Sequence, residues 1–359
     1  MRAGVVTPGQ ASSGRVEEIE APTPGPGECV VQTLEIGICG TDMEIDRAEY
    51  GEAPPGSPYL ILGHESLGRV LSVPLGEREL KAGDLVAGIV RRPCPECCPS
   101  CADGQWDMCE TGHYTERGIK GAHGFMSERY TESPAYLVRL PQDLRSVGVL
   151  TEPMSVVEKG VDQVFLAQRR LHWVPRRAVV LGAGPIGLLA AMLLRLRGIQ
   201  VTVCDQVEPT SPRAKIATDI GGEYQNLAGT SLTAFLSGKT LPDLIVEATG
   251  YSPLVFEAAQ NLGRNGALLL TAVTGGKRTV GVDANVINSD MVLENHIILG
   301  SVNANRDHFL MAVRDLGAIH VLYPLALEAL ITRRIPLAQW TQGLTKEPGD
   351  IKAVVEVQK

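Results

Sequence analysis

The residues best suited to chemistry gather in one short stretch of the chain. Five of the eight cysteines, Cys94, Cys97, Cys98, Cys101 and Cys109, lie within sixteen residues. In a chain expected to stay in the cytoplasm, such crowding favours thiolates on a metal over disulfides. A tetrahedral zinc takes four ligands, so one thiol is spare, and a site closed by four thiolates has no open position for a substrate. The stretch therefore predicts a structural zinc site.

A second group of candidate ligands lies nearer the N-terminus. Cys39 stands in "GICGTD", and His64 and Glu65 stand in "GHE". Sulfur, nitrogen and oxygen donors of this kind hold zinc in catalytic sites, where three protein ligands leave one position open. Taken alone, a cysteine on a β-segment is more often a small core residue, so this prediction depends on the rest of the chain.

A third pattern predicts a dinucleotide site. Gly182, Gly184 and Gly187 have the G-x-G-x-x-G spacing between an apolar strand and a helix, and Asp205 ends the next strand. The glycines allow a tight turn, close approach of a pyrophosphate and close helix–strand packing. A carboxylate at 205 can accept both ribose hydroxyls and repels a 2′-phosphate, so NAD is favoured; Arg213 lies further along and leaves NADP possible.

These groups need elements to position them, and the chain supplies two kinds. Short β-branched runs separated by turn signals, such as 28–38, 66–73 and 83–90, indicate a β-rich first half. From about residue 175, apolar strands alternate with helices, which predicts a parallel sheet covered on both faces. After about residue 300 the pattern is mixed and ends in a strand.

The totals exclude several classes of protein. A length of 359 residues fits two domains, and a formal charge of −8 without a long basic run argues against nucleic acid. The apolar runs are shorter than a membrane span, and the N-terminal residues lack the pattern of a signal peptide. We therefore expect a cytoplasmic protein that binds neither nucleic acid nor membrane.

Together, these motifs resemble the zinc-dependent medium-chain dehydrogenases over nearly the whole chain. The resemblance implies an α/β fold with a GroES-like β-rich catalytic domain, split in sequence, and a doubly wound Rossmann cofactor domain. The expected division is 1–168 with 302–359 for the catalytic domain and 169–301 for the NAD(P)-binding domain. Relatives form dimers or tetramers, commonly through edge strands of the cofactor domain, so a homo-oligomer is expected.

Three stretches, 113–130, 150–160 and 300–309, look like the glucose dehydrogenases of that superfamily. By this resemblance, Cys39, His64 and Glu152 hold the catalytic zinc, with Glu65 able to enter or leave its shell. Asp42 matches a carboxylate that orients the histidine. Substrate contacts are expected from Thr41, Glu116, Glu152 and Asn303. Cofactor contacts are expected from Gly182, Ala183, Gly184, Pro185, Ile186, Gly187, Asp205, Thr249, Ala272, Val273, Val302 and Asn303.

The resemblance also bears on the spare thiol. The family's structural zinc loop ends Cys-x2-Cys-x7-Cys, which Cys98, Cys101 and Cys109 match. Neighbouring side chains of an extended chain point to opposite sides, so Cys97 and Cys98 would strain the backbone by sharing one ion. We therefore predict Cys94 as the fourth ligand and Cys97 as spare, with Cys94, Cys97, Cys101 and Cys109 as the alternative set.

The implied reaction is zinc-assisted hydride transfer from the anomeric carbon of an aldose, glucose first, to nicotinamide, giving an aldonolactone. Thr41 is the first candidate for a proton relay, with Glu65 or Glu152 accepting through water. Met43 and Glu44 replace a histidine relay found in many relatives, and Val90 replaces a sugar-contacting asparagine. A polyol (sorbitol-type) or threonine-type zinc dehydrogenase is the alternative.

Overall fold

The computed structural model describes residues 1–358 and divides them into two compact units. The first comprises Met1–Ser155, Asn303–Gly317 and the C-terminal segment from Leu330, and the second comprises Val156–Val302 and Ala318–Ala329. These limits differ from the sequence-based ones at helix α3 (Thr151–Gln168) and at residues 318–329. The boundaries drawn from the sequence stay a prediction. Within residues 1–358, no helix has the length and apolar character needed to cross a bilayer.

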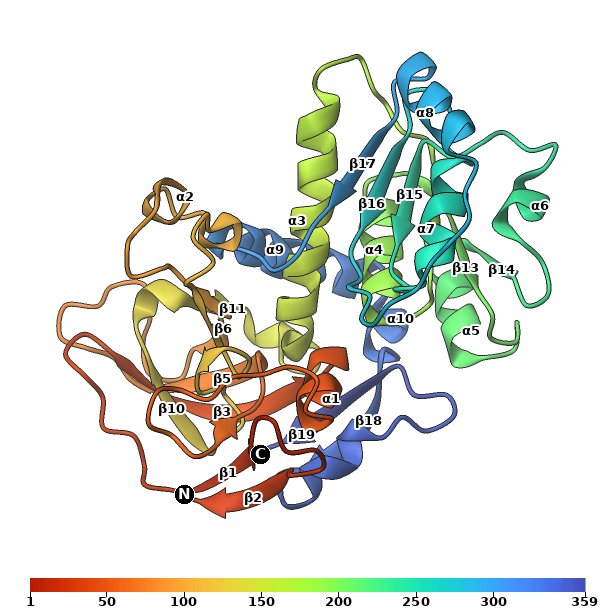
Figure 1. Cartoon of the computed structure of the whole chain (residues 1–359). Helices are drawn as coiled ribbons and strands as arrows, with labels where there is room; N and C mark the ends of the chain where they lie inside the picture. Colours follow the sequence, from red (N-terminus) through yellow and green to blue (C-terminus); the bar gives the residue numbers. More distant parts are fainter. Residues whose placement is uncertain (359) are drawn as a thin grey trace. The chain divides into compact units, whose positions relative to one another are not determined.

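The first unit is built on a seven-stranded sheet (Figure 1). Its central strand β3 (Cys29–Ile38) pairs antiparallel with β5 (Glu65–Ser72) and, near its end, with β19 (Lys352–Glu356). β3 is largely buried along its length, including the polar side chains of Thr33 and Glu35. The remaining strands in the path β11–β6–β5–β3–β19–β18, with β10 against β3, are β6 (Leu85–Gly88), β10 (Arg129–Glu132), β11 (Leu137–Leu140) and β18 (Ile331–Pro336).

Two small sheets complete this unit. One has the order β2–β1–β4 and the other the order β7–β8–β9. Their strands are β1 (Arg2–Val6), β2 (Arg15–Glu18), β4 (Leu60–Ile61), β7 (Arg91–Arg92), β8 (Thr115–Arg117) and β9 (Gly121–Ala122).

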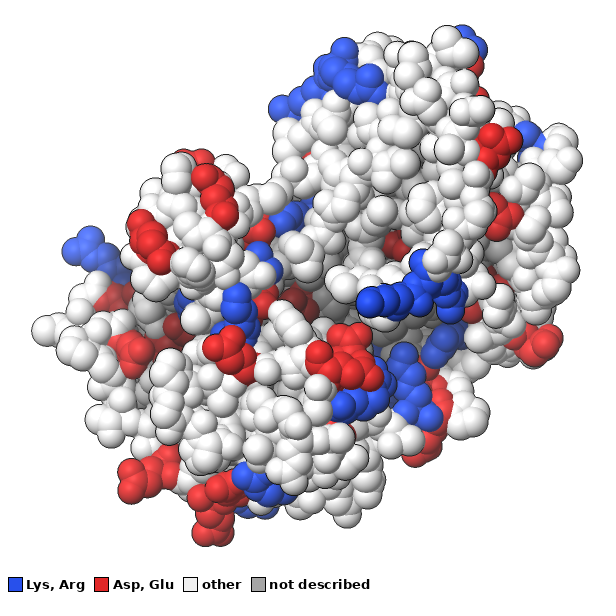
Figure 2. Space-filling view, in the orientation of Figure 1, with Lys and Arg blue, Asp and Glu red and all other residues white. Residues whose placement is uncertain are grey.

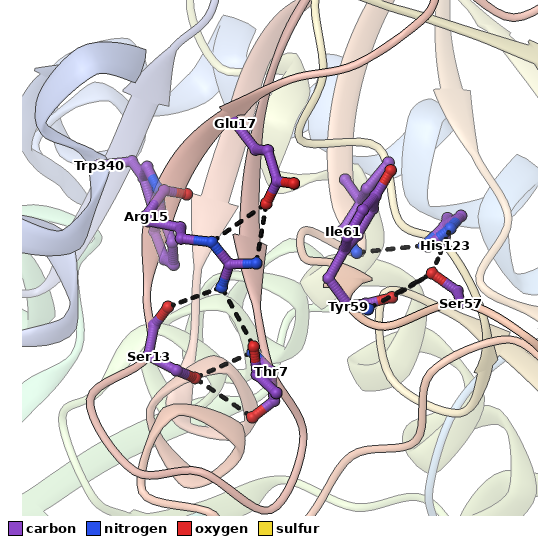
Figure 3. Close-up of polar contacts among 9 residues, drawn as sticks. All are labelled: Thr7, Ser13, Arg15, Glu17, Ser57, Tyr59, Ile61, His123 and Trp340. Carbon is purple, nitrogen blue, oxygen red and sulfur yellow. Dashed lines mark hydrogen bonds and ion pairs between the residues drawn. The ribbon is translucent and has the colours of Figure 1, made fainter.

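Polar contacts hold the ends of the first small sheet (Figure 3). Arg15 Nη1 donates to Thr7 Oγ1 at 3.1 Å, and Trp340 Nε1 donates to the Arg15 carbonyl at 3.1 Å. On the other side, His123 Nδ1 accepts from the Ile61 amide at 3.2 Å, and its ring stacks on Tyr59. Burial and the nearby Arg117 lower the pKa of His123, so the ring is neutral near pH 7. The C-terminal part of the chain and the segment around His123 are thereby fixed to this sheet.

The segment after His123 also fixes the approach to the candidate metal ligands. The amides of Gly124, Phe125 and Met126 donate to the carbonyls of residues 61, 63 and 62, at 2.7, 2.8 and 2.9 Å. A Cβ at Gly124 would lie 2.6 Å from the Gly63 carbonyl oxygen and closer still to that of Leu62. Only glycine lets the two backbones approach this closely, and the chain that is held here continues directly into His64.

The second unit is a six-stranded parallel sheet in the order β14–β13–β12–β15–β16–β17. Numbered along the chain, this is the order 3-2-1-4-5-6 of the Rossmann fold, so the fold class expected from the sequence is confirmed. Its strands are β12 (Arg177–Leu181), β13 (Gln200–Asp205), β14 (Glu223–Asn226), β15 (Leu244–Glu247), β16 (Ala267–Leu270) and β17 (Ile297–Gly300). The main helices of the unit are α4 (Pro185–Leu196), α5 (Pro212–Asp219), α7 (Ser252–Ala259) and α8 (Ala284–Leu293).

Acidic and basic side chains are interspersed over the visible face of the molecule (Figure 2). Such mixing is typical of a solvated surface.

The close approach at residue 124 gives a test of how the first unit is held. Gly124→Ala should lower the free energy of unfolding by about 1–3 kcal/mol, because a methyl group must displace backbone and not a flexible side chain. Gly317→Ala is the matched control: it lies inside helix α9 (Arg306–Leu322), and nothing lies within 4 Å of its added Cβ. That control should be neutral or stabilising by up to about 1 kcal/mol. If Gly124→Ala and Gly317→Ala change the free energy of unfolding equally in denaturant unfolding, the packing argument is contradicted.

Candidate catalytic metal site and cofactor loop

The end of β3 and the start of β5 bring the first two candidate ligands together. Cys39 follows β3 and caps helix α1 (Gly40–Asp46), while His64 directly precedes β5. Cys39 Sγ lies 3.0 Å from His64 Nε2, so one small ion can reach both atoms. Thr41, the candidate for a proton relay, is half-buried in the first turn of α1.

Asp42 contacts the backbone of Cys39 and lies near the His64 ring nitrogen that points away from Cys39. Its side chain is fully buried, Oδ2 accepts the Cys39 amide at 2.9 Å, and Oδ1 lies 3.6 Å from His64 Nδ1. Asp42 Oδ1 and His64 Nδ1 are both buried without a hydrogen-bond partner, and 3.6 Å is slightly too long for a hydrogen bond between them, so a small movement of either side chain would pair the two atoms. A proton on Nδ1 shared with Asp42 leaves Nε2 free as a ligand, which is the usual arrangement of a metal-binding histidine.

Glu65 completes a cluster of possible ligands, and it has a partner that the sequence analysis missed. The ligand atoms of Cys39, His64 and Glu65 all lie within 4.8 Å of one another. Glu65 also forms a buried ion pair with Lys352 of β19. Gly37 leaves room for this pair, since a Cβ there would lie 3.0 Å from Lys352 Cε and would overlap the Glu65 carboxylate. A lysine inside the apolar run 351–357 was the signal available in the sequence.

Glu152 lies in the first turn of α3 and is not part of that three-residue cluster. It is nevertheless buried and close enough for the charges of His64, Glu65 and Lys352 to affect its pKa. Burial is the main cause that raises the pKa of Glu152 to about 7 in the metal-free protein. A cation at Cys39 and His64 would stabilise the ionised carboxylate and reverse that shift.

The electrostatics of the cluster fit a zinc ion. Burial acts to lower the pKa of His64, but the Cys39 thiolate and Asp42 outweigh it and raise that pKa well above its usual value. Burial likewise opposes the charge of Lys352, yet Glu65 raises the pKa of Lys352. The site thus holds more acidic groups than Lys352 can neutralise. Its sulfur, nitrogen and oxygen donors are those that zinc accepts, so a divalent cation suits both the charge and the donor set.

Two of the four residues expected to contact a sugar, Glu116 and Asn303, lie together. Asn303 Nδ2 donates to Glu116 Oε1 at 2.7 Å, across 187 positions of sequence. Arg91 donates to the same oxygen through Nε and Nη2, at 3.1 and 3.0 Å, and stacks its guanidinium over Tyr114. The buried Glu116 carboxylate is therefore held in a fixed orientation by one cation and one amide. Arg91 was also missed by the sequence analysis.

The cysteine loop forms a separate cluster. The sulfur atoms of Cys94, Cys98, Cys101 and Cys109 lie within 4.8 Å of one another, whereas Cys97 is exposed and outside this cluster. The Glu110 amide donates to Cys98 Sγ, which lowers the pKa of that thiol. Hydrogen bonds to Thr111 and Gly112 oppose the effect of burial and lower the pKa of Cys109 to about 6. Burial raises the pKa of Cys101 to about 12, so only the thiols of Cys98 and Cys109 are favoured as thiolates without a metal. The close approach of all four sulfur atoms suits a closed tetrahedral zinc site.

The glycine loop of the second unit has the geometry of a nucleotide site. Gly182 has φ +101°, Gly184 precedes α4 with nothing within 4 Å of an added Cβ, and a Cβ at Gly187 would lie 3.0 Å from the Gly182 carbonyl carbon. The three glycines thus serve the turn, the open approach and the close packing, respectively. Asp205 ends β13, and its Oδ2 accepts the Ala183 amide at 2.6 Å.

The remaining cofactor candidates lie at the ends of later strands or just beyond them. Thr249 follows β15 and donates through its amide to Glu247 Oε1 at 2.7 Å. Val273 and Val302 are exposed, and the Val302 carbonyl accepts from Lys159 Nζ at 2.8 Å. The other members of the expected set are Pro185 and Ile186 at the start of α4, Ala272 after β16, and Asn303, which belongs to the first unit.

Fold and site together define a class. A β-rich unit with a Cys–His–Glu cluster and a four-thiolate loop, joined in one chain to a Rossmann unit with a dinucleotide loop, is a zinc-dependent medium-chain dehydrogenase.

Comparison with known proteins narrows that class. Residues 25–142 match the alcohol dehydrogenase GroES-like domain, and residues 145–357 match the glucose dehydrogenase C-terminus. A glucose 1-dehydrogenase from Methanocella arvoryzae is 44% identical over 99% of both chains, and one from Thermoproteus tenax is 40% identical over 100% of both. The structure of Haloferax mediterranei glucose dehydrogenase in complex with NADP, Zn and gluconolactone superposes with a TM-score of 0.92 at 32% identity, covering 100% of both chains. The chain belongs to the glucose dehydrogenase family.

The cysteine cluster predicts two different outcomes for adjacent residues. Cys98→Ser should lower bound zinc by about one equivalent per chain, because it removes one of four thiolates from a closed site. Cys97→Ser should leave the zinc content unchanged, since that side chain is exposed. Metal analysis of the purified proteins checks both, and the opposite pattern would reassign the spare thiol.

Glu152 predicts a pH dependence in the protein stripped of its catalytic metal. Its folded pKa of about 7 lies above the unfolded value, so ionisation is disfavoured in the fold and stability falls as pH rises from about 4.5 to 7. The loss should approach about 3 kcal/mol for this carboxyl. Glu152→Gln removes this carboxyl. In denaturant unfolding, the free energy of unfolding of the variant should therefore rise relative to that of the parent between pH 5 and pH 8. If the difference in free energy of unfolding between variant and parent is the same at pH 5 and pH 8, this assignment is contradicted.

Proposed function

We propose that the protein oxidises an aldose, D-glucose first, at its anomeric carbon and transfers the hydride to NAD(P)+. The observation that carries this proposal is the arrangement of the half-buried Cys39 with the buried His64 and Asp42 in a chain of the glucose dehydrogenase family. The C1–H bond supplies the hydride that reduces the nicotinamide ring. The anomeric O–H supplies a proton that leaves for solvent, so the product is the lactone.

We assign the catalytic metal to Cys39, His64 and Glu152, with Glu65 beside it. A zinc ion held there supplies Lewis acidity that lowers the pKa of the sugar hydroxyl. Asp42 fixes the tautomer and direction of His64 through the Nδ1 face. Thr41 on α1 begins the proton route, and Glu65 or Glu152 accepts the proton through a bound water.

Specificity for a sugar follows from groups that need hydroxyl partners. Glu116, held by Arg91 and Asn303, presents a buried carboxylate of fixed direction. A site built to satisfy hydroxyl groups rejects analogues that lack them, since its polar groups would be left unpaired. This argues for a polyhydroxylated substrate over an aliphatic alcohol.

We further propose NAD as the preferred nucleotide, because Asp205 ends β13 and opposes a 2′-phosphate. In the Haloferax mediterranei relative the bound nucleotide is NADP, so both cofactors belong in the assay. The eight cysteines are free, which suits thiolate ligands in the reducing cytoplasm.

A homo-oligomer is proposed through the open edge of β17. That strand ends the sheet, and exposed apolar side chains lie on it and on α8; they are Val286, Met291, Val292, Leu293 and Ile298. Edge strands with apolar neighbours are candidate pairing sites. A solution mass of one chain at micromolar concentration would contradict this.

Initial rates test the function. With glucose, galactose, xylose, arabinose and sorbitol, each with NAD and NADP, we expect turnover of aldoses and loss of activity after the catalytic metal is removed by chelation. Asn303→Ala should raise KM for the sugar by about tenfold or more, because it removes the amide that, with Arg91, fixes the direction of the Glu116 carboxylate. Turnover of sorbitol without any aldose would overturn the sugar assignment, and full activity after zinc removal would overturn the mechanism.

A further inference from the structure

The candidate catalytic cluster contains a cation that the reaction above does not use. Lys352 pairs with Glu65, and each residue is 2% exposed. A buried ion pair is weak evidence for stability, since its desolvation offsets much of its attraction. The position of this pair beside the proposed metal ligands therefore calls for another explanation.

Strand register shows how the chain builds the pair. Gly37 of β3 is paired with Glu65 on one side and with Val354 on the other. Residues two apart on a strand share a face, so Lys352 lies on the same face as Val354 and its side chain crosses Gly37 to reach Glu65. The bare glycine between them is what makes this crossing possible.

Without Lys352, Glu65 would be a ligand. Its carboxylate lies within 4.8 Å of Cys39 Sγ and His64 Nε2, a separation that a shared zinc ion can close. In the structure, both of its carboxylate oxygens face Lys352 Nζ. The carboxylate thus has two competing cations, the lysine and the metal.

We propose that Lys352 is a positioning residue that holds the Glu65 carboxylate beside the catalytic metal and off it, so that one coordination position stays open for the sugar. The inference rests on the proposed catalytic zinc at Cys39 and His64. It adds that Lys352 of β19, near the C-terminal end of the chain, keeps one coordination position of this zinc open.

Metal retention separates this role from a merely structural one. In Lys352→Met the unpaired Glu65 should bind the metal, so chelator-driven release of the catalytic ion should slow by about tenfold or more while kcat falls. If Lys352 only stabilised the fold, its loss would speed release. Lys352→Arg is the matched control: it keeps the charge and should release metal at the parent rate. Adding Glu65→Gln to Lys352→Met should abolish the slowing.

Cobalt at the catalytic site, with zinc kept at the four cysteines, reports coordination directly. Lys352→Met should weaken the visible absorption, as expected when a fifth ligand is added to a four-coordinate ion. Glu65→Gln alone should leave the spectrum unchanged, because Glu65 is not a ligand in the parent. Glu65→Gln tests the premise that Glu65 lies off the metal even if Lys352→Met does not fold.

Three results would overturn the inference. They are faster metal release from folded Lys352→Met, a changed cobalt spectrum in Glu65→Gln, and equal slowing in Lys352→Arg and Lys352→Met. Each can occur in an active glucose dehydrogenase, so the proposed function would survive them. If the parent protein binds zinc only at the four cysteines, it has no catalytic metal. In that case this inference and the proposed function both fail.

Discussion

The first unit depends on the burial of several acidic groups at one end of β3. Asp42, Glu65 and Glu152 are buried around His64, with the half-buried Cys39 beside them, and buried carboxylates without compensating charges are costly. Lys352 offsets one of these charges, and a divalent cation would offset two more. The fold therefore holds the shape of the site through its strands, while its electrostatic balance requires an ion.

Segments that are distant in sequence converge to satisfy this requirement. β3 brings Cys39, the segment before β5 brings His64, and the strand nearest the C-terminus brings Lys352. The contact of Asn303 with Glu116 follows the same pattern. The continuation of the first unit after residue 303 therefore adds to the candidate site as well as to a sheet, because it supplies Lys352 beside the candidate metal ligands and the Asn303 amide beside the Glu116 carboxylate.

Much of this could be predicted from the sequence, and the remainder has a physical reason. Strand–helix alternation and the glycine spacing predict the Rossmann unit because both depend on local order along the chain. The cysteine spacing points to the cluster found at Cys94, Cys98, Cys101 and Cys109 for the same reason. Lys352 and Arg91 escaped notice because their roles depend on pairing across strands, and a single sequence does not give register. The position of Glu65 relative to Glu152 likewise depends on packing.

Gly37 carries a consequence for how this family can change. The space that its missing side chain leaves is filled by the Glu65–Lys352 pair, so the three positions share one small volume at the centre of the sheet. A larger residue at 37 is compatible only with a shorter side chain at 65 or 352. A neutral residue at 352 leaves the Glu65 carboxylate without its ion-pair partner. Natural variation at these positions should therefore be correlated, because a change at one of them alone would either overfill this volume or leave the Glu65 carboxylate without its lysine.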